Sequence, residues 1–230
     1  RPPDQTMEDS PEAKRYHRSR RRLSVASFLI DFAVLVILLA TGGSIALRAV
    51  AERWSHQPAL ALLIFLVLFG ALTKVVGLPL DFIGGYWLEH RYGLSNLALA
   101  GWIKDQLKGF AVGGALAALG LECVYAIMRR WPEHWWLISG TLFVGFFVVL
   151  AHLAPVLIFP IFFKFKALEN PTLTARLLEL SRRAGTRVQG VFEWKLSEKS
   201  KKANAALVGL GSTRRIILAD TLLEKFSDDE

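Results

Sequence analysis

The side chains best suited to catalysis or metal binding do not form a complete set in this sequence. Its five histidines are never four residues apart, so the pattern H-E-x-x-H, which places two zinc-binding imidazoles and a glutamate base on one helix, is absent. There is also no G-x-S-x-G turn and no Walker loop. The single cysteine, Cys123, lies in an apolar stretch without an activating neighbour, which favours a packing role. The residues alone therefore define no catalytic centre.

Four ionisable residues, Asp31, Lys74, Glu122 and His152, interrupt otherwise apolar stretches. A charge at the centre of a bilayer costs at least about 2.5 kcal/mol, so such residues usually face a bundle interior or a wet cavity. Lys74 and Glu122 lie near the ends of their stretches, where extending the charged group to the membrane surface is an equal alternative. Asp31 and His152 favour an interior site.

The elements that carry these residues are membrane helices. Hydrophobic residues make up 53% of the 230 residues and mean hydropathy is +0.35, above ordinary soluble usage. Crossing about 30 Å of hydrocarbon takes roughly 20 apolar residues in a helix. The fold class is therefore membrane α-helical, with about four transmembrane helices. They are expected over residues 23–47, 58–80, 110–128 and 135–159.

The basic residues predict the orientation of these helices. Lys and Arg cluster before the first stretch and follow the fourth, whereas the loops after the first and third stretches hold only two each. The positive-inside rule then makes the amino terminus, the loop 81–109 and everything after residue 163 cytoplasmic. This topology explains the net charge of +8 without nucleic acid, for which the known binding motifs are absent. Residues 1–22, polar and basic, are expected to be a disordered tail.

The loop 81–109 divides the membrane domain, residues 23–163, because it is too polar to cross a bilayer. Ser95 and Asn96 are suited to cap a helix, and Trp102 favours an interface. We expect this helix to lie on the cytoplasmic membrane surface. There Glu89 or Asp105 would pair with a basic turn at Arg214 and Arg215, and Lys108 with nearby acidic groups. A solvated connector without contacts is the alternative.

Residues 164–230 change from membrane periodicity to that of a small α/β lobe. Asn170 as cap, Pro171 at the first helical position and Gly185 as a stop predict an amphipathic helix. The segments VQGVFEWKL, NAALVGLG and RIILAD predict strands, and a turn with Gly211 joins the last two. The segment TLLEKF predicts the opening of a further helix, capped by Asp220 or Thr221.

Two segments in the expected order resemble one family. LEHRYGLSNLALAGWIKDQLKG and NAALVGLGSTRRIILADTLLE are similar to characteristic segments of the integral-membrane CAAX prenyl proteases, zinc metalloendopeptidases related to the heat-shock protease HtpX. The resemblance covers roughly residues 23–230 and fits the amino-terminal part of such an enzyme. The matching loop residues are Glu89, Gly93, Asn96, Asp105 and Lys108, and those of the lobe include Asn204, Ala205, Asp220 and Thr221.

The resemblance implies a role for each part. The lobe would begin a cytoplasmic zinc-peptidase domain whose H-E-x-x-H helix lies beyond residue 230, so zinc belongs to the complete enzyme and none is expected on this chain, which should be inactive alone. The strand at Asn204 and Ala205 would pair with the substrate backbone. Partners would be the lipid bilayer, a peptide or membrane-protein substrate, and the remainder of the peptidase domain. The loop residues would position the lobe.

Two other functions remain open at this point. A non-catalytic membrane scaffold or regulator related to such proteases would share the same sequence features, particularly if 230 residues were the natural length. A transporter would use the intramembrane charges, but the halves show no evident repeat. A bacterial inner membrane is a better expectation than the endoplasmic reticulum.

Overall fold

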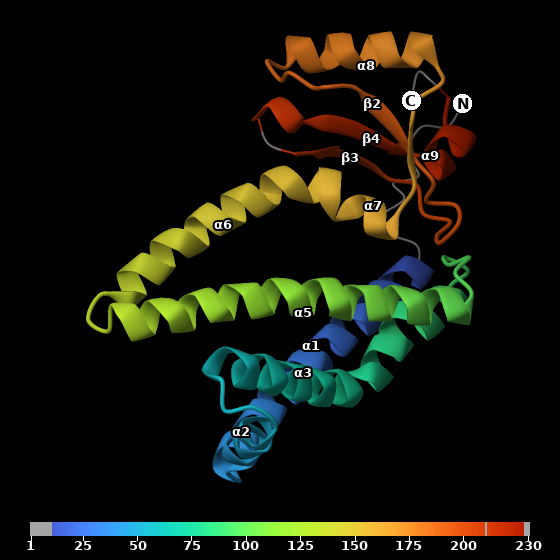
Figure 1. Ribbon diagram of the computed structural model, residues 1–230. Helices are drawn as coiled ribbons and strands as arrows, with labels where there is room; N and C mark the ends of the chain where they lie inside the picture. Colours follow the sequence, from blue (N-terminus) through green and yellow to red (C-terminus); the bar gives the residue numbers. More distant parts are fainter. Residues whose placement is uncertain (1–10, 210, 228–230) are drawn as a thin grey trace. The chain divides into compact units, whose positions relative to one another are not determined.

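The computed structural model describes residues 11–209 and 211–227, except for the side chains of residues 155, 156 and 212. The chain divides into two compact units. The first comprises Arg1–Gly93 and Gly114–Ala118, and the second comprises Leu94–Gly113 and Leu119–Glu230. Figure 1 shows long helices leading into a small sheet. The expected membrane α-helical class is confirmed, because four helices in the described residues are long and apolar enough to span a membrane.

The first unit contains α1 (Pro11–Ala40), α2 (Gly43–Trp54) and α3 (Pro58–Phe82). Gly42, with φ of 71°, separates α1 from α2, because this backbone conformation does not fit a continuous right-handed helix. The helix of α3 continues through a π-helical turn, η1 (Ile83–Trp87), into α4 (Leu88–Arg91). Gly84 and Gly85 lie in that turn, and glycine weakens the preference for a regular α-helix.

The expected disordered tail is wrong for residues 11–22, which form the first turns of α1; residues 1–10 lie outside the described part. Tertiary contacts of Tyr16, described below, explain this helix, which composition did not predict.

The second unit contains α6 (Trp135–Leu157), the short α7 (Phe159–Phe162) and all of α5 (Leu99–Arg130) except Gly114–Ala118. The expected separate helix inside the loop 81–109 is wrong, because its residues are the first turns of α5. Together with the continuation of α3 to Arg91, this leaves only residues 92–98 outside helices. Many apolar side chains of these helices are exposed, as expected of surfaces that face lipid.

The lobe of the second unit is a four-stranded sheet with helices (Figure 1). In chain order its elements are β1 (Phe165–Ala167), α8 (Pro171–Arg183), β2 (Val191–Trp194), β3 (Ala205–Val208), η2 (Gly211–Thr213), β4 (Arg215–Ala219) and α9 (Asp220–Lys225). The strand order is β1-β2-β4-β3, with β2 and β4 parallel and the other pairs antiparallel. Val191, Leu196, Ile217, Leu218 and Ala219 are buried and form its core.

The predicted start and stop signals of α8 are confirmed. The side chain of Asn170 accepts a hydrogen bond from the backbone N–H of Leu173 at 3.0 Å, Pro171 opens α8, and Gly185 has φ of 67°. The three segments expected to form strands contain β2, β3 and β4.

Candidate substrate-binding edge and its support

Strand β3 forms one edge of the sheet, and no strand among the described residues pairs with its outer side. Asn204, which the sequence singled out, precedes the strand, and Ala205 opens it. The side chains of Ala205 and Leu207 are exposed, and those of Ala206 and Val208 are partly buried. An exposed edge of this kind offers unpaired backbone groups to another extended chain.

The register shows which backbone groups face outward. Ala205 lies opposite Leu218, so Asn204 lies opposite Ala219, whose N–H donates to the Asn204 carbonyl at 2.9 Å. In an antiparallel ladder, directly opposed pairs alternate between hydrogen-bonded and non-hydrogen-bonded. Ala206 therefore exchanges hydrogen bonds with β4, whereas the N–H and C=O of Ala205 and Leu207 point away from the sheet. Asn204 thus uses its carbonyl within the sheet, and the free edge consists of Ala205 and Leu207.

The segment that leads into β3 is fixed to the start of α9 by Asp220. The backbone N–H and the hydroxyl of Ser197 donate to the two carboxylate oxygens, at 2.9 and 2.5 Å, and the Thr221 N–H donates at 2.8 Å. The Thr221 hydroxyl, which is buried, donates to the Lys202 carbonyl at 2.7 Å. The expected cap at Asp220 or Thr221 is wrong, because both residues lie inside α9, whose N-cap is Ala219 without a side-chain cap hydrogen bond. The two side chains instead hold the approach to β3.

The pKa of Asp220 is lowered. Burial alone would raise it, but the hydrogen bonds from the Ser197 hydroxyl and from the backbone of Ser197, Thr221 and Leu196 together outweigh burial. A carboxyl group with a lower pKa in the folded protein adds stability above its unfolded pKa, and this stability is lost as pH falls through the folded pKa.

We therefore expect Asp220→Asn to weaken the lobe at neutral pH and to matter progressively less below about pH 4, near the ordinary pKa of aspartate. Hydrogen exchange of residues 195–222, followed from pH 3 to 7 in the bilayer-embedded protein, measures the difference. Glu198→Gln is a control, because that carboxylate is exposed and its one ion pair within residues 11–209 and 211–227 is with Lys164, at 2.9 Å. A difference between wild type and Asp220→Asn that is independent of pH would contradict the assigned role of the carboxylate.

Residues 94–96 bind the same segment through backbone contacts. The Asn96 N–H donates to the Lys199 carbonyl at 3.1 Å, and the Asn96 side-chain amide donates to the Ser197 carbonyl at 2.9 Å. In return, the Lys201 N–H donates to the Leu94 carbonyl at 3.0 Å, and Ser95 and Ser200 form a single antiparallel bridge. The expected functional residue Asn96 therefore contacts the lobe directly, in the segment that precedes β3.

Asp105 and Lys108 lie on α5 and contact other segments of the second unit. The Lys199 ammonium donates to the Asp105 carboxylate at 2.5 Å and lies 4.7 Å from the centre of the Phe163 ring. Lys108 donates to the Ile161 carbonyl at 2.6 Å. The expected partners were wrong: Asp105 pairs with Lys199 and not with the basic turn, and Lys108 binds a carbonyl and not an acidic group. The sequence could not identify Lys199, because Lys195, Lys201 and Lys202 lie close to it and only the folded contact with α5 sets it apart.

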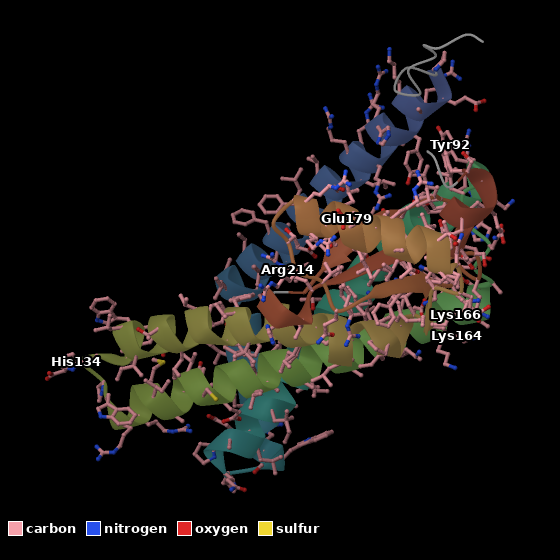
Figure 2. The ribbon with its side chains drawn as sticks, turned by 90° about the horizontal axis from the view of Figure 1, so that it is seen from above. Tyr92, His134, Lys164, Lys166, Glu179 and Arg214 are labelled. Carbon is pink, nitrogen blue, oxygen red and sulfur yellow. The ribbon has the colours of Figure 1, made fainter. Side chains whose placement is uncertain are left out.

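The basic turn has other contacts. Arg215 donates to Gln189 at 3.1 Å and stacks on Phe192, and the Arg214 carbonyl accepts from the Gln189 N–H at 2.8 Å. Figure 2 labels Arg214, and also Lys164 and Lys166 at the start of β1. Lys166 pairs with Glu193 at 3.2 Å, a hydrogen bond that raises the pKa of the lysine. The turn is therefore fixed within the lobe itself.

Glu89 belongs to a polar cluster of the first unit. The Tyr16 hydroxyl donates to its carboxylate at 2.5 Å, Arg20 donates to both at 2.7 and 3.2 Å, and the Tyr16 ring packs edge-on against Tyr92. The expected pairing of Glu89 with Arg214 or Arg215 is replaced by this cluster. Gly93, the residue after Tyr92, has φ of 64°, a conformation that glycine adopts without strain.

The intramembrane charges have different surroundings. Lys74 and Asp81 form an ion pair at 2.5 Å within α3, Asp31 is exposed, and His152 lies near the Thr213 hydroxyl at 3.4 Å. One carboxylate oxygen of Glu122 is buried with no hydrogen-bond partner in the described residues. Across residues 11–209 and 211–227, no group of three His, Cys, Asp or Glu residues is placed to hold a metal ion.

Comparison with known proteins gives one family. The family model described as CAAX prenyl protease N-terminal, five membrane helices, matches residues 5–164. The chain is 31% identical over 218 residues to an uncharacterized metalloprotease, YhfN, of Bacillus subtilis, covering 95% of this chain and 51% of that protein. It is 34% identical over 174 residues to CAAX prenyl protease 1 of Saccharomyces cerevisiae, covering 73% and 37%.

A solved structure gives the same fold. The crystal structure of S. mikatae Ste24p superposes with a TM-score of 0.83 at 24% identity, over 98% of this chain and 55% of that one. This chain therefore spans about half the length of the solved structure and of YhfN, and 37% of the Saccharomyces cerevisiae protease.

Proposed function

Because the chain belongs to the family of the CAAX prenyl protease N-terminal domain, we propose that it is the membrane and substrate-strand portion of an integral-membrane zinc metalloendopeptidase. The observation that carries this proposal is the outer edge of β3, where the backbone groups of Ala205 and Leu207 face away from the sheet. A peptide or membrane-protein substrate would add a strand there, with main-chain hydrogen bonds giving affinity and side-chain contacts giving specificity.

This part of the chain would position the substrate and would not itself bind zinc. Its described residues bring no three metal ligands together, so they do not fit a zinc site and we assign no catalytic step to them. In the complete enzyme, ligands supplied by a further segment would hold the zinc. Asn96, Asp105 and Lys199 would then fix the segment that precedes β3, so that a paired substrate strand keeps one position.

The remainder of the peptidase domain would cover an open groove of the lobe. The groove, of about 710 Å³, lies between α8 and α9 and is lined by Leu173, Leu177, Leu222, Leu223 and Phe226 among others. Leu180 at its rim is 63% exposed. The relatives have about as many residues again as this chain, which would supply such a cover.

Zinc content and peptide cleavage test the proposed function together. We expect the 230-residue chain alone to bind no stoichiometric zinc and to cleave nothing, and a longer protein containing it to bind about one zinc and to lose activity with a chelator. Elemental analysis and cleavage of a prenylated and an unprenylated peptide measure both. A zinc-free longer protein without cleavage would favour a scaffold or regulator.

We propose further that the amino terminus and the lobe are cytoplasmic, in a bacterial inner membrane. The basic flanks of the helices support this orientation. In a protein with Cys123→Ser, an impermeant thiol reagent added to intact cells should label Gln57→Cys and not Glu198→Cys, two exposed positions. Labelling of Glu198→Cys but not Gln57→Cys would reverse the orientation.

A further inference from the structure

The first turns of α1, which precede its apolar part, are held by the polar cluster of Glu89. Tyr16 is only 7% exposed, and its hydroxyl bonds to Glu89 while Arg20 bonds to both. Leu23 lies on the same side of the helix, 3.7 Å from the position that a Cβ on Gly84 would take. This side of α1 therefore packs against the end of the α3–η1–α4 helix.

Four arginines occupy the other side of the same turns. Successive residues of an α-helix are about 100° apart, which places Arg15, Arg18, Arg21 and Arg22 within an arc of about 120°, nearly opposite Tyr16, Arg20 and Leu23. All four are exposed, and none forms an ion pair within residues 11–209 and 211–227. We call these four residues the arginine face.

The arginine face lies at the depth of lipid headgroups. The apolar part of α1 begins at Leu23, directly after Arg22, and at a rise of 1.5 Å per residue Arg15 lies only about 10 Å further out. The headgroup layer is about 5–8 Å thick on each side, and charges act over about 8 Å at physiological salt. All four guanidinium groups can therefore reach lipid phosphates.

We propose that the arginine face is a binding site for anionic phospholipid headgroups. A guanidinium group matches the oxygens of a phosphate with paired donors, and a basic residue at an anionic surface contributes about a fivefold gain in binding. A topology signal needs only the number of charges. Here a rigid helix also gathers them on one side, and the Tyr16–Glu89 contact keeps that side turned away from the α3–η1–α4 helix.

Photocrosslinking in nanodiscs that hold the full chain tests the site. The yield with a photoreactive phosphatidylglycerol is compared with the yield with the matching phosphatidylcholine analogue. Mass spectrometry of the peptide containing residues 11–22 measures crosslinking. We expect the phosphatidylglycerol yield to exceed that of phosphatidylcholine several-fold. Arg18→Gln/Arg22→Gln should remove most of this preference, and Arg18→Lys/Arg22→Lys should keep most of it.

The control Arg182→Gln/Arg183→Gln removes two arginines of α8 that pair with Glu179, labelled in Figure 2, and should leave the crosslink unchanged. An equal yield for both lipids, or an equal loss in the control, would overturn the proposal. Competition by millimolar glycerol 3-phosphate separates the two sources of phosphate: unchanged crosslinking supports a lipid site, and displacement would assign the arginines to a soluble phosphate instead.

Discussion

Leu207→Pro in the complete enzyme is expected to reduce peptide cleavage by at least about tenfold while the lobe stays folded. Proline removes the Leu207 N–H, which points away from the sheet, and each main-chain hydrogen bond to substrate contributes about 1 kcal/mol, with the ring adding a steric block. The Leu207 side chain is 56% exposed, so its loss costs the fold little. Turnover of a short peptide, with zinc content and thermal unfolding alongside, measures the effect.

Two matched variants make this expectation specific. Leu207→Val keeps the backbone donor and should cleave at close to the wild-type rate. Ala206→Pro removes an N–H that faces β4 and should destabilise the lobe itself, because a proline there removes a ladder hydrogen bond. Wild-type cleavage by folded Leu207→Pro would show that substrate does not pair with this edge.

Asp105→Ala should reduce cleavage by about tenfold without loss of zinc. The pair with Lys199 is partly buried, at 26% and 21% side-chain exposure, and breaking such a pair leaves the ammonium above the Phe163 ring without its counter-charge. The segment that carries Asn204 would then lose one of its fixed points. Activity and zinc content of the purified enzyme separate this positioning role from metal binding.

A double-mutant cycle identifies the contact responsible. Asp105→Ala, Lys199→Met and their combination should show a coupling of about 1 kcal/mol or more, so that the double variant is little worse than either single one. Lys164→Met breaks the exposed pair with Glu198 in the same segment and should have almost no effect. Additive losses, or a zinc-free Asp105→Ala enzyme, would contradict the assignment.

Glu89→Ala is also expected to lower activity with zinc retained, through loss of the Tyr16 and Arg20 contacts. The effect should be smaller than that of Asp105→Ala, because these contacts join α1 to α4 within the first unit and not to the segment before β3.

Local sequence chemistry predicted those parts of the fold that depend on local forces. The four apolar helices follow from length and hydropathy, and α8 follows from Asn170, Pro171 and Gly185. The strand at Ala205 followed from the β-like segment NAALVGLG, and its expected role in pairing with substrate came from the family resemblance. The register then added Leu207, because the alternation of hydrogen-bonded pairs depends on which residue lies opposite Ala219.

Two of the errors involve contacts between distant segments, and a third concerns where a helix begins. Composition predicted a disordered start for residues 11–22, but Tyr16 finds Glu89, 73 residues away, and this contact stabilises the helix. Asp105 was assigned to the wrong cation, because nothing in the spacing favours Lys199 among the lysines of its segment. Residues 97–109 are too polar to cross a bilayer and were therefore expected to form a separate helix. A helix can nevertheless continue from a polar segment into an apolar one, as α5 does.

Because α5 is one continuous helix, a change in its tilt moves both of its ends. Its 32 residues form one rod of about 48 Å, with Asp105 and Lys108 in the first three turns of it. A tilt of about 5° around the midpoint moves that end by about 2 Å, which is enough to break a hydrogen bond of about 2.9 Å. A membrane helix adapts to changes in hydrocarbon thickness by tilting. Bilayer thickness would therefore change the position of β3, which is linked to α5 through Asp105 and Lys199. The same protein would then cleave at different rates in thin and thick membranes, with its peptide-binding residues unchanged.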